Sequence, residues 1–599
     1  RVTDSNLPIF LPLPEPAMPL SQKRLLFNET HTASANRLYR LDEEKQLRFQ
    51  LGYIHDRTTR QYGSEEIYYF VQDTGHTATN RHDRLKTDCL NAEVNYEDNT
   101  VSRYTRENFS FAGTWKSGVS DITGDNAIFQ KIKNSQWELK NYFNQLYTKE
   151  KYTWGIRSYI RYTHCPASLT VAHRNLPILF ADNMLIANCI YHRNELSSPD
   201  NISENTYRTV IGQTHESILA EYEEMNTGNA YTDNVLYGMR KINGVNYQLT
   251  GGFCGELSSV KQENAYSAHS YSFYTVPRIE WERNDFLFTA ATTVRWSHLP
   301  KQSYSRFCVS PFFCFRYKFT PRWKMSLLGS LDESEGGLKD IYPFRYREDY
   351  RTVVKHTGKV PVTVRQLYTC YLEYKNTIKE FFWTLSASYS HNRYNLITER
   401  NYKDGNFYLS SVERNHSSHS YTLNTIGSKG IYDWNLKTSL ELTLARNEGK
   451  QLNEGIVQDY RYDYLCIEPK IVWAPSVFFE AEYKATVSCV GGGIGEDTSL
   501  DPLWEVAQRL TLSLEFHDTE FRLSGEHFYN DLSKNQHLNI WLADVSLIHK
   551  VGKWRFAASA INLFNKEQYR YTLYSAVQSY TSWIKLRPRE FMVSVQYQW

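Results

Sequence analysis

The sequence predicts an all-β fold, a single large antiparallel transmembrane β-barrel of about 20–22 strands. Three observations predict it: the alternation of apolar and polar residues in the closing segment 590–599, a high content of tyrosine and tryptophan, and short turns that alternate with long connections along the chain. No apolar run is long enough for a transmembrane helix, so strands would have to cross the bilayer.

The closing segment has one apolar face and one mostly polar face. Phe591, Val593, Val595, Tyr597 and Trp599 share one parity, and a β-strand sends successive side chains to opposite faces. In a soluble protein this strand would be an exposed edge that favours aggregation. The alternative that it is the last strand of a soluble β-sandwich is retained. In an outer-membrane barrel the apolar face contacts lipid. We therefore expect these five residues to form the strand that closes the barrel against the first strand.

Composition points to a membrane interface and gives no sign of nucleic acid as a partner. The chain carries 45 Tyr and 14 Trp among 599 residues, and these side chains concentrate where hydrocarbon meets water. The net charge is +2, which gives no electrostatic case for a nucleic-acid partner. Nine cysteines are scattered without a CxxC pair, so a metal site is poorly supported.

Alternating runs joined by very short polar turns recur through the chain. Trp281 and Phe286 flank one such turn, and Phe319 and Trp323 flank another; this spacing is typical of antiparallel hairpins. Long connections rich in Asn, Ser, Tyr and charge are expected at the other strand ends, over residues 166–206, 332–365 and 391–420. This asymmetry indicates an outer-membrane barrel with periplasmic turns and extracellular loops.

The domain organisation is predicted to be simple. Residues 1–22 are rich in proline, which removes ladder donors, so we expect an extended segment or loop there. Residues 23–599 form the barrel, and no second domain is evident. The chain begins without the basic and apolar regions of a signal peptide, so a signal peptide was removed or was never included.

Residues 342–351 form the candidate ligand-contacting loop, because Arg and Tyr are mixed there as on recognition surfaces. The candidates are Tyr342, Arg345, Tyr346, Arg347, Tyr350 and Arg351. A solvated, charge-balanced loop is the default interpretation of the same residues.

Two other motifs are weaker. Gly491–Glu496 superficially resembles a phosphate loop, but no helical pattern follows it, so we expect an extracellular loop. His416 and His419 have metal-ligand spacing without a nearby carboxylate or cysteine, and a solvated loop is expected there too. No Ser/His/Asp constellation is apparent, so the prediction contains no catalytic residue, cofactor or metal, and no enzyme activity.

Two distant segments carry a family resemblance. The stretch Ala560–Tyr569 (AINLFNKEQY), followed by Ser579–Ser582 and Leu586–Phe591 (LRPREF), is similar to TonB-dependent receptors of Bacteroidota, and so is Pro19–His31. The pairing of Asn-Leu-Phe-Asn with Leu-Arg-Pro-Arg is the most specific part. The resemblance implies a 22-stranded barrel filled by an N-terminal plug domain that bears a TonB box.

The chain departs from that family pattern at its start. No plug and no TonB box are found ahead of Arg1, and the first strand or strands are expected to be missing as well. The upstream part could be further chain, a separate polypeptide or truly absent. The ending is also unlike that of the glycan-importing receptors that pair with a surface lipoprotein.

The leading functional expectation is a TonB-dependent transporter in the Gram-negative outer membrane that binds a nutrient through its extracellular loops. The expected partners are outer-membrane lipid and lipopolysaccharide, the TonB complex through a plug not present here, and a surface lipoprotein or other outer-membrane subunits. The main alternative is a receptor-like barrel without a plug that serves as a structural subunit of a larger complex, and a third reading is a passive pore. The sequence leaves the cargo open.

Overall fold

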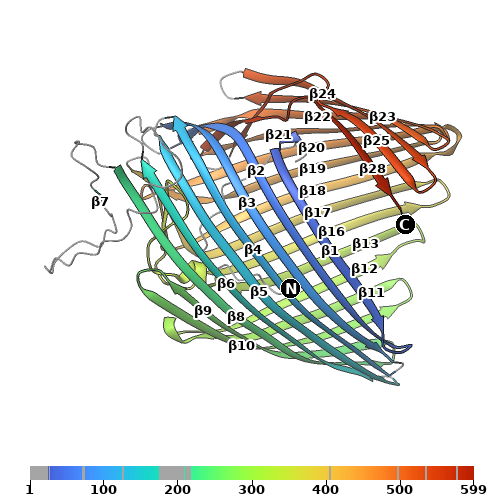
Figure 1. Ribbon diagram of the computed structural model, residues 1–599. Helices are drawn as coiled ribbons and strands as arrows, with labels where there is room; N and C mark the ends of the chain where they lie inside the picture. The colour runs from blue at the N-terminus through green and yellow to red at the C-terminus, as the bar shows by residue number, and fades with distance from the viewer. Residues whose placement is uncertain are drawn as a thin grey trace.

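A computed structural model describes most of the chain: residues 20, 24–25, 27–69, 74–100, 102–124, 127–150, 152–173, 208–209, 218–403, 406–495, 498–532, 536–574 and 578–598. These residues form a large antiparallel sheet rolled into a barrel of long, tilted strands (Figure 1). The predicted fold class is confirmed, and no plug is evident among the described residues. No helix in these ranges is long and apolar enough to cross a membrane.

The described residues contain 28 strands. Those of the first half are β1 (Phe27–Arg40), β2 (Lys45–Tyr69), β3 (Thr74–Asn99), β4 (Arg103–Gly124), β5 (Ile128–Lys149), β6 (Tyr152–His173), β7 (Arg208–Thr209), β8 (Ile218–Ile242), β9 (Val245–Lys261), β10 (Ala265–Arg283), β11 (Phe286–Leu299), β12 (Tyr304–Lys318), β13 (Trp323–Glu335), β14 (Tyr346–Arg347) and β15 (Thr352–Lys355).

The remaining strands are β16 (Val362–Asn376), β17 (Phe381–Lys403), β18 (Asn406–Ile431), β19 (Leu436–Asn453), β20 (Ile456–Ser476), β21 (Phe479–Ile494), β22 (Thr498–Phe516), β23 (Thr519–Leu532), β24 (Gln536–Val551), β25 (Trp554–Ile561), β26 (Gln568–Tyr574), β27 (Gln578–Lys585) and β28 (Glu590–Tyr597). Helical turns are short: η2 (Pro300–Gln302), α1 (Leu338–Ile341) and η3 (Tyr432–Trp434). β7, β14 and β15 belong to loops and the last hairpin is broken into four pieces, so the described wall has 23 strands, one more than the upper end of the predicted 20–22.

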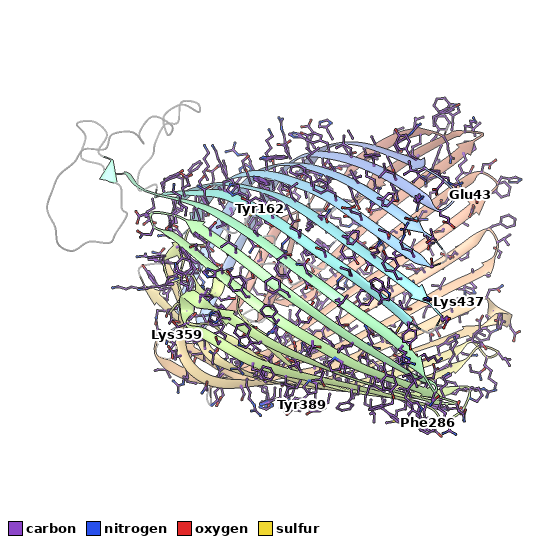
Figure 2. The ribbon with its side chains drawn as sticks, turned by 90° about the horizontal axis from the view of Figure 1, so that it is seen from below. Glu43, Tyr162, Phe286, Lys359, Tyr389 and Lys437 are labelled. Carbon is purple, nitrogen blue, oxygen red and sulfur yellow. The ribbon has the colours of Figure 1, made fainter. Side chains whose placement is uncertain are left out.

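Short turns gather at one end of the barrel, as the sequence predicted. The turn between β10 and β11 contains only Asn284 and Asp285, with Arg283 paired to Phe286. Asn284 has φ 51°, a left-handed conformation that asparagine tolerates better than most residues. Figure 2 shows Glu43, Lys437 and Phe286 toward this short-turn end, and Lys359 at the opposite, long-loop end.

The expected long connections are only partly confirmed. Residues 391–420 are not a loop, because β17 and β18 run on through them and leave only residues 404–405 between the two strands. Residues 166–173 likewise continue β6, and 174–206 lie outside the described residues; Gly491–Ile494 are in β21. The alternation signal fails in these extensions because both faces of a strand beyond the bilayer contact water or polar lumen.

The outer face of the wall is apolar where the strands cross the bilayer. In β12, Phe307, Val309 and Phe313 are 64%, 42% and 45% exposed, while the intervening Cys308 is 2% exposed. Tyr389 lies on the outer surface between the two ends (Figure 2). A barrel with an exposed apolar band is the form in which β-proteins reside in an outer membrane, so the predicted integral location is confirmed.

The two ends of the sheet do not meet in the expected way. The closing strand β28 pairs with β25, and β1 pairs with β2; no pairing joins β1 to β28 among the described strands. β1 and β27 are both antiparallel to β2, and β28 points toward the same end as β1 (Figure 1), so a ladder between β1 and β28 would have to be parallel. The expected closure of Phe591–Tyr597 on the first strand stays a prediction, and Trp599 lies outside the described residues.

Closure occurs instead at the long-loop half. Tyr62–Tyr68 of β2 pair with Gln578–Ile584 of β27, so the last hairpin reaches the start of the wall there. In the short-turn half, β28 is exposed at every residue after Glu590 and β1 at every residue after Phe27. Among the described strands, β1 pairs only with β2 and β28 only with β25, and we call the boundary between β1 and β28 the seam.

The Asn-Leu-Phe-Asn and Leu-Arg-Pro-Arg motifs form the bend between the two halves of the last hairpin. Asn562 has φ 53° and is 3% exposed. Its Nδ2 donates to the carbonyl oxygens of Lys566 (2.9 Å) and Arg587 (2.8 Å), and its Oδ1 accepts from the Lys566 amide (3.0 Å). Asn565 Oδ1 accepts from the Arg589 amide at 2.9 Å. The motif residues thus satisfy the backbone groups that leave the ladder at the bend.

The bend places a second, smaller core beside the closure. Tyr569, Ile584 and Leu586 are buried with Phe528 and Leu542 of β23 and β24. At its edge, the Arg24 guanidinium contacts Glu526 (2.8 Å) and Asp544 (2.8 Å). The expectation that residues 1–22 are an extended segment stays a prediction, since nearly all of them lie outside the described residues.

We expect Asn562→Ala to destabilise the barrel by about 2–4 kcal/mol, because it leaves buried backbone groups unpaired and places alanine at positive φ. Asn435→Ala is the matched control, since Asn435 also has positive φ (48°) but is exposed in a short turn. Urea unfolding of the purified barrel in micelles, followed by tryptophan fluorescence, measures both. Equal losses in the two variants would contradict a role for the Asn562 side-chain hydrogen bonds.

Candidate functional site: a loop that crosses the mouth of the barrel

The connection between β13 and β16 folds into the barrel mouth instead of standing in solvent. We call residues 336–361 the crossing loop. It contains α1, then the small hairpin β14–β15, in which Tyr346 pairs with Val354. Asp349 shapes the hairpin turn, because its Oδ1 accepts from the amides of Arg351 (2.8 Å) and Thr352 (2.7 Å). An aspartate that captures amides two and three residues ahead is a common turn former.

The loop is joined first to its own side of the wall. Thr352–Lys355 of β15 pair in parallel with Phe407–Ser410 of β18. The Asn395 side chain, in β17, donates to the Val360 carbonyl oxygen (3.0 Å) and accepts from the Val362 amide (2.7 Å). These bonds hold the C-terminal part of the loop on β17 and β18. The Gly336 amide donates to the Pro361 carbonyl oxygen at 2.8 Å, which joins the two ends of the loop and lets its middle extend away from β16–β18.

The middle of the loop reaches the opposite wall through an ion pair. Arg351 Nη2 lies 2.7 Å from each carboxylate oxygen of Glu66 in β2. The Glu66 side chain is 4% exposed and that of Arg351 18%. About half of the wall strands lie between β2 and β13 in either direction around the barrel, so the two strands are on opposite sides of it. The loop that follows β13 therefore crosses the mouth to make this contact.

A second charged contact lies on β8. Arg347 Nη2 pairs with Glu221, and the Arg347 amide donates to Glu223 Oε2 at 2.9 Å. The guanidinium also donates to the Tyr350 carbonyl oxygen at 2.8 Å. Arg347 is 6% exposed, and a buried guanidinium is tolerated only when its donors are satisfied in this way.

Aromatic rings fill the space between these ion pairs. The Arg81 guanidinium of β3 lies 5.4 Å from the centre of the Tyr62 ring and 5.3 Å from that of Tyr350. Such cation–π contacts add about 0.5–2 kcal/mol each, with the larger values in desolvated sites. They fix the Tyr350 ring against the wall next to the Arg351–Glu66 pair.

An apolar cluster completes the contact. Tyr342 and Tyr346 are at most 1% exposed and pack with inward-facing residues of β4 and β6, including Ile122 and Leu169. Tyr342 donates from its hydroxyl to Gln262 Oε1 at 3.0 Å, on the connection between β9 and β10. Burial raises the pKa of Tyr342 to about 12, so the phenol is neutral at physiological pH.

The predicted ligand-contacting residues therefore differ in their burial. Tyr342, Tyr346, Arg347 and Tyr350 are buried, Arg351 is half-buried, and Arg345 is exposed, with its guanidinium 5.6 Å from the centre of the Tyr408 ring. The structure brings them together on one loop, and their contact with a ligand stays a prediction.

The partners of these residues were not found from the sequence. They are Glu66, Arg81, Glu221, Glu223 and Gln262, each on a distant strand or connection. In the sequence these residues are distinguished only as polar side chains at positions that face the lumen, and many other residues have the same property.

The two histidines of the weaker metal-ligand motif lie in a strand and contact other rings. His416 is in β18, where its ring stacks on Tyr394 at 4.8 Å, and His419 stacks near His391 at 4.5 Å. No group of three or more potential metal ligands occurs in the described part of the chain. The solvated loop expected at these histidines is corrected to a strand.

Comparison with known proteins gives similarity in shape only. No known family matches the sequence, and no curated protein does. The outer membrane transporter YddB from Escherichia coli is 10% identical, with a TM-score of 0.47, over 94% of this chain and 76% of that one. A mutant of the ferric enterobactin receptor PfeA from Pseudomonas aeruginosa is 11% identical, with a TM-score of 0.48, over 94% and 79%.

The ferric yersiniabactin uptake receptor FyuA from Yersinia pestis is 8% identical, with a TM-score of 0.41, over 96% of this chain and 81% of that one. At such identities no ligand or activity transfers to this chain.

Arg351→Ala is expected to release the crossing loop from the opposite wall, since truncating one partner of a buried ion pair costs about 3–5 kcal/mol. The readout is limited proteolysis of the purified barrel, with cleavage expected between residues 342 and 356. Lys359→Ala is the control, because Lys359 and Glu413 are both more than 60% exposed and such pairs contribute little. Equal protease resistance of Arg351→Ala and the wild type would show that the ion pair does not hold the loop.

Docking of the loop is expected to weaken as pH falls below about 6.5, the ordinary pKa of histidine. His356 Nδ1 lies 2.8 Å from Ser411 Oγ, and burial is the main cause that lowers its pKa, with opposing effects from Asp340 and Glu348 and a further lowering by Lys339. A histidine that is held neutral when docked takes up a proton more readily when released, so docking is complete above its ordinary pKa and is lost as pH falls toward the lowered value.

Hydrogen exchange of residues 352–358 at pH 7.5 and pH 5.5, after correction for intrinsic rates, measures this effect. His356→Gln should abolish most of the pH dependence. An unchanged pH dependence in that variant would assign the effect to other groups.

Proposed function

We propose that this chain is the barrel of an outer-membrane receptor that binds a nutrient at its extracellular mouth and imports it past the crossing loop, with energy from the TonB complex. The observation that carries the proposal is the crossing loop itself. A passive pore gains nothing from a loop anchored by ion pairs on the opposite wall, whereas a receptor needs a closure that a ligand can displace. The coupling to TonB rests on the resemblance of the Asn-Leu-Phe-Asn and Leu-Arg-Pro-Arg motifs.

The chemistry of the mouth supports recognition of a polar solute. Phe344 and Arg345 are exposed residues of the crossing loop that directly precede β14, and they place an aromatic ring and a cation next to each other in the sequence. A ligand that competes for Arg351 or Arg347 would weaken the contact with Glu66 or Glu221 and favour the released loop. The nutrient, any surface lipoprotein and any further subunit belong to this proposal as unidentified partners.

A structural role in a larger complex is the second candidate, and the seam favours it. The described strands form no ladder between β1 and β28, and a strand of another polypeptide that paired there would complete the wall. Co-purification with a stoichiometric partner that survives high salt would support this role.

Uptake measurements test the proposal directly. A strain that lacks the protein is expected to lose uptake of at least one member of a panel of radiolabelled ferric siderophores, copper, haem and cobalamin, and depletion of TonB is expected to cause the same loss. Complementation with the wild-type chain should restore uptake. Normal uptake of the whole panel in both strains would overturn the transport proposal.

Replacement of residues 338–360 by a short Gly/Ser linker is expected to make cells several-fold more sensitive to vancomycin, a hydrophilic antibiotic that the outer membrane excludes. Arg345→Ala is the matched control, because Arg345 is an exposed residue of the loop and forms no ion pair among the described residues. Unchanged sensitivity with normal amounts of the loop-deleted protein would show that the crossing loop does not close the mouth.

A further inference from the structure

The wall is split between β12 and β13 in the half nearer the long loops. Their ladder ends at the pair Phe312–Ser330, although β12 begins at Tyr304 and β13 runs on to Glu335. Both upper segments keep their other partners, since β12 stays paired with β11 as far as Tyr304 and β13 with β16 as far as Glu335. The wall therefore divides here into a β12 side and a β13 side.

The sequence accounts for the place where the split begins. Pro311 is the first residue of β12 beyond the ladder, and proline has no backbone N–H to donate to a neighbouring strand. Next to it, the Ser310 side chain contacts the β13 backbone, because its Oγ accepts from the Glu333 amide at 3.3 Å. Side chains thus take over from the backbone ladder in this part of the wall.

Two arginines bridge the split. Arg306 Nε and Nη2 lie 3.1 Å and 2.9 Å from Glu333 Oε2. Arg295 belongs to β11, one strand further away, and its Nη2 donates to the Glu333 carbonyl oxygen at 3.1 Å and lies 3.5 Å from Glu335 Oε2. We call these four residues the latch.

The latch is only partly satisfied and loosely packed. Arg295 Nε is buried without a hydrogen-bond partner in the described structure. A buried polar group in that state costs free energy, which hydration on opening would return. A cavity of about 730 Å³ adjoins the latch, and Tyr304, Arg306 and Val364 are among the residues that line it. The two sides of the split can therefore separate without disrupting a close-packed core.

The β13 side of the split carries the crossing loop. The loop starts at Gly336, directly after the latch residue Glu335, and the Gly336 amide is bonded to the Pro361 carbonyl oxygen at 2.8 Å. The hairpin within the loop pairs with β18 through β15. The contacts of the loop with β2 and β8, described above, each use at least one side chain and reach the β12 side. The latch and these loop contacts therefore join the same two sides of the wall.

We propose that Arg295 and Arg306 are positioning residues for the crossing loop. They hold the end of β13, from which the loop starts, so opening of the latch and release of the loop from Glu66 promote each other. The inference rests on the proposed function only for its meaning in uptake. The coupling itself is a property of the purified barrel, so it and the transport proposal are tested by separate measurements.

Cys308 is a native reporter of the latch. It lies two residues from Arg306 on the same face of β12, pairs with Arg295 and is 2% exposed. Labelling of Cys308 by a water-soluble maleimide in the purified full chain, quantified by mass spectrometry of its peptide, therefore measures opening of the split. Cys466 is the internal control, because it is 7% exposed and lies in β20, which contributes no residue to the latch or the loop.

Glu333→Gln removes the charge that both arginines hold. This variant is expected to speed the labelling of Cys308 and the amide exchange of residues 346–355 by about fivefold or more, the lower end of the usual coupling between two sites. Arg351→Ala does not touch the latch, yet it is expected to speed the labelling of Cys308 as well, because coupling between two equilibria is reciprocal.

Glu373→Gln is the matched control for the change of charge on the wall. Glu373 pairs with Lys324 at 2.6 Å, where β13 is still in ladders with β12 and β16. This variant should label at Cys308 and exchange in the loop as the wild type does. Heat-modifiable migration on gels confirms that each variant is folded.

Three results would overturn the proposal. Unchanged labelling of Cys308 in Arg351→Ala would show that the loop is released while the latch stays closed. Faster labelling of Cys308 in Glu333→Gln, with unchanged exchange in the loop, would show that the latch opens without the loop. A parallel rise in the labelling of Cys466 would assign the effects to general loosening of the barrel.

Discussion

The requirement that backbone groups inside a bilayer be paired governs this structure. The ladder from β1 to β28 satisfies that requirement over nearly the whole wall. Among the described strands the exception is the seam, where β1 and β28 run in the same direction and form no ladder with each other. The chain compensates by bending its last hairpin at Asn562, so that β27 reaches β2 in the long-loop half. The small core around Tyr569 and the Arg24 ion pairs both depend on that bend.

The same constraint explains why the mouth can hold a structured loop. The wall strands extend beyond the membrane, so inward-facing side chains such as Glu66 and Glu221 stand above the bilayer with a rigid backbone behind them. The crossing loop uses them as fixed anchors, and its own hairpin supplies Arg347 and Arg351 at matching positions. Burial of both guanidiniums is stable only because each finds a carboxylate or a carbonyl oxygen. An anionic solute that binds either arginine more strongly than its carboxylate partner does shifts the equilibrium from the docked loop to the released loop. The two ion pairs thus provide a route to ligand-driven opening.

The sequence predicted the fold class and location well, because the bilayer imposes a two-residue period and a belt of aromatics. The alternation in Phe591–Tyr597 and the short turns, such as the one at Asn284, were enough to identify the wall. The extensions of β17 and β18 were missed since their two faces are both polar. Alternation does not encode strand direction, so it carried no sign that β28 would run in the same direction as β1.

The sequence predicted which loop forms the candidate site, but not which residues of the wall that loop contacts. The mixture of Arg and Tyr in residues 342–351 identified the right segment. The same composition occurs in exposed recognition loops and in loops that are buried against a wall, so it does not distinguish the two. What separates the two cases is a partner on a distant strand, and Glu66 carries no local sign that it faces Arg351.

A double-mutant cycle on Glu66 and Arg351 tests the central claim most directly. The free energy of opening of residues 346–355 is measured by hydrogen exchange in the wild type, Glu66→Ala, Arg351→Ala and the double variant. The account predicts that each single change lowers it strongly, that the double change costs little more than either alone, and that the coupling is about 1.5 kcal/mol or larger. Additive effects of the two changes, with no coupling, would show that the loop is not held across the mouth by this pair.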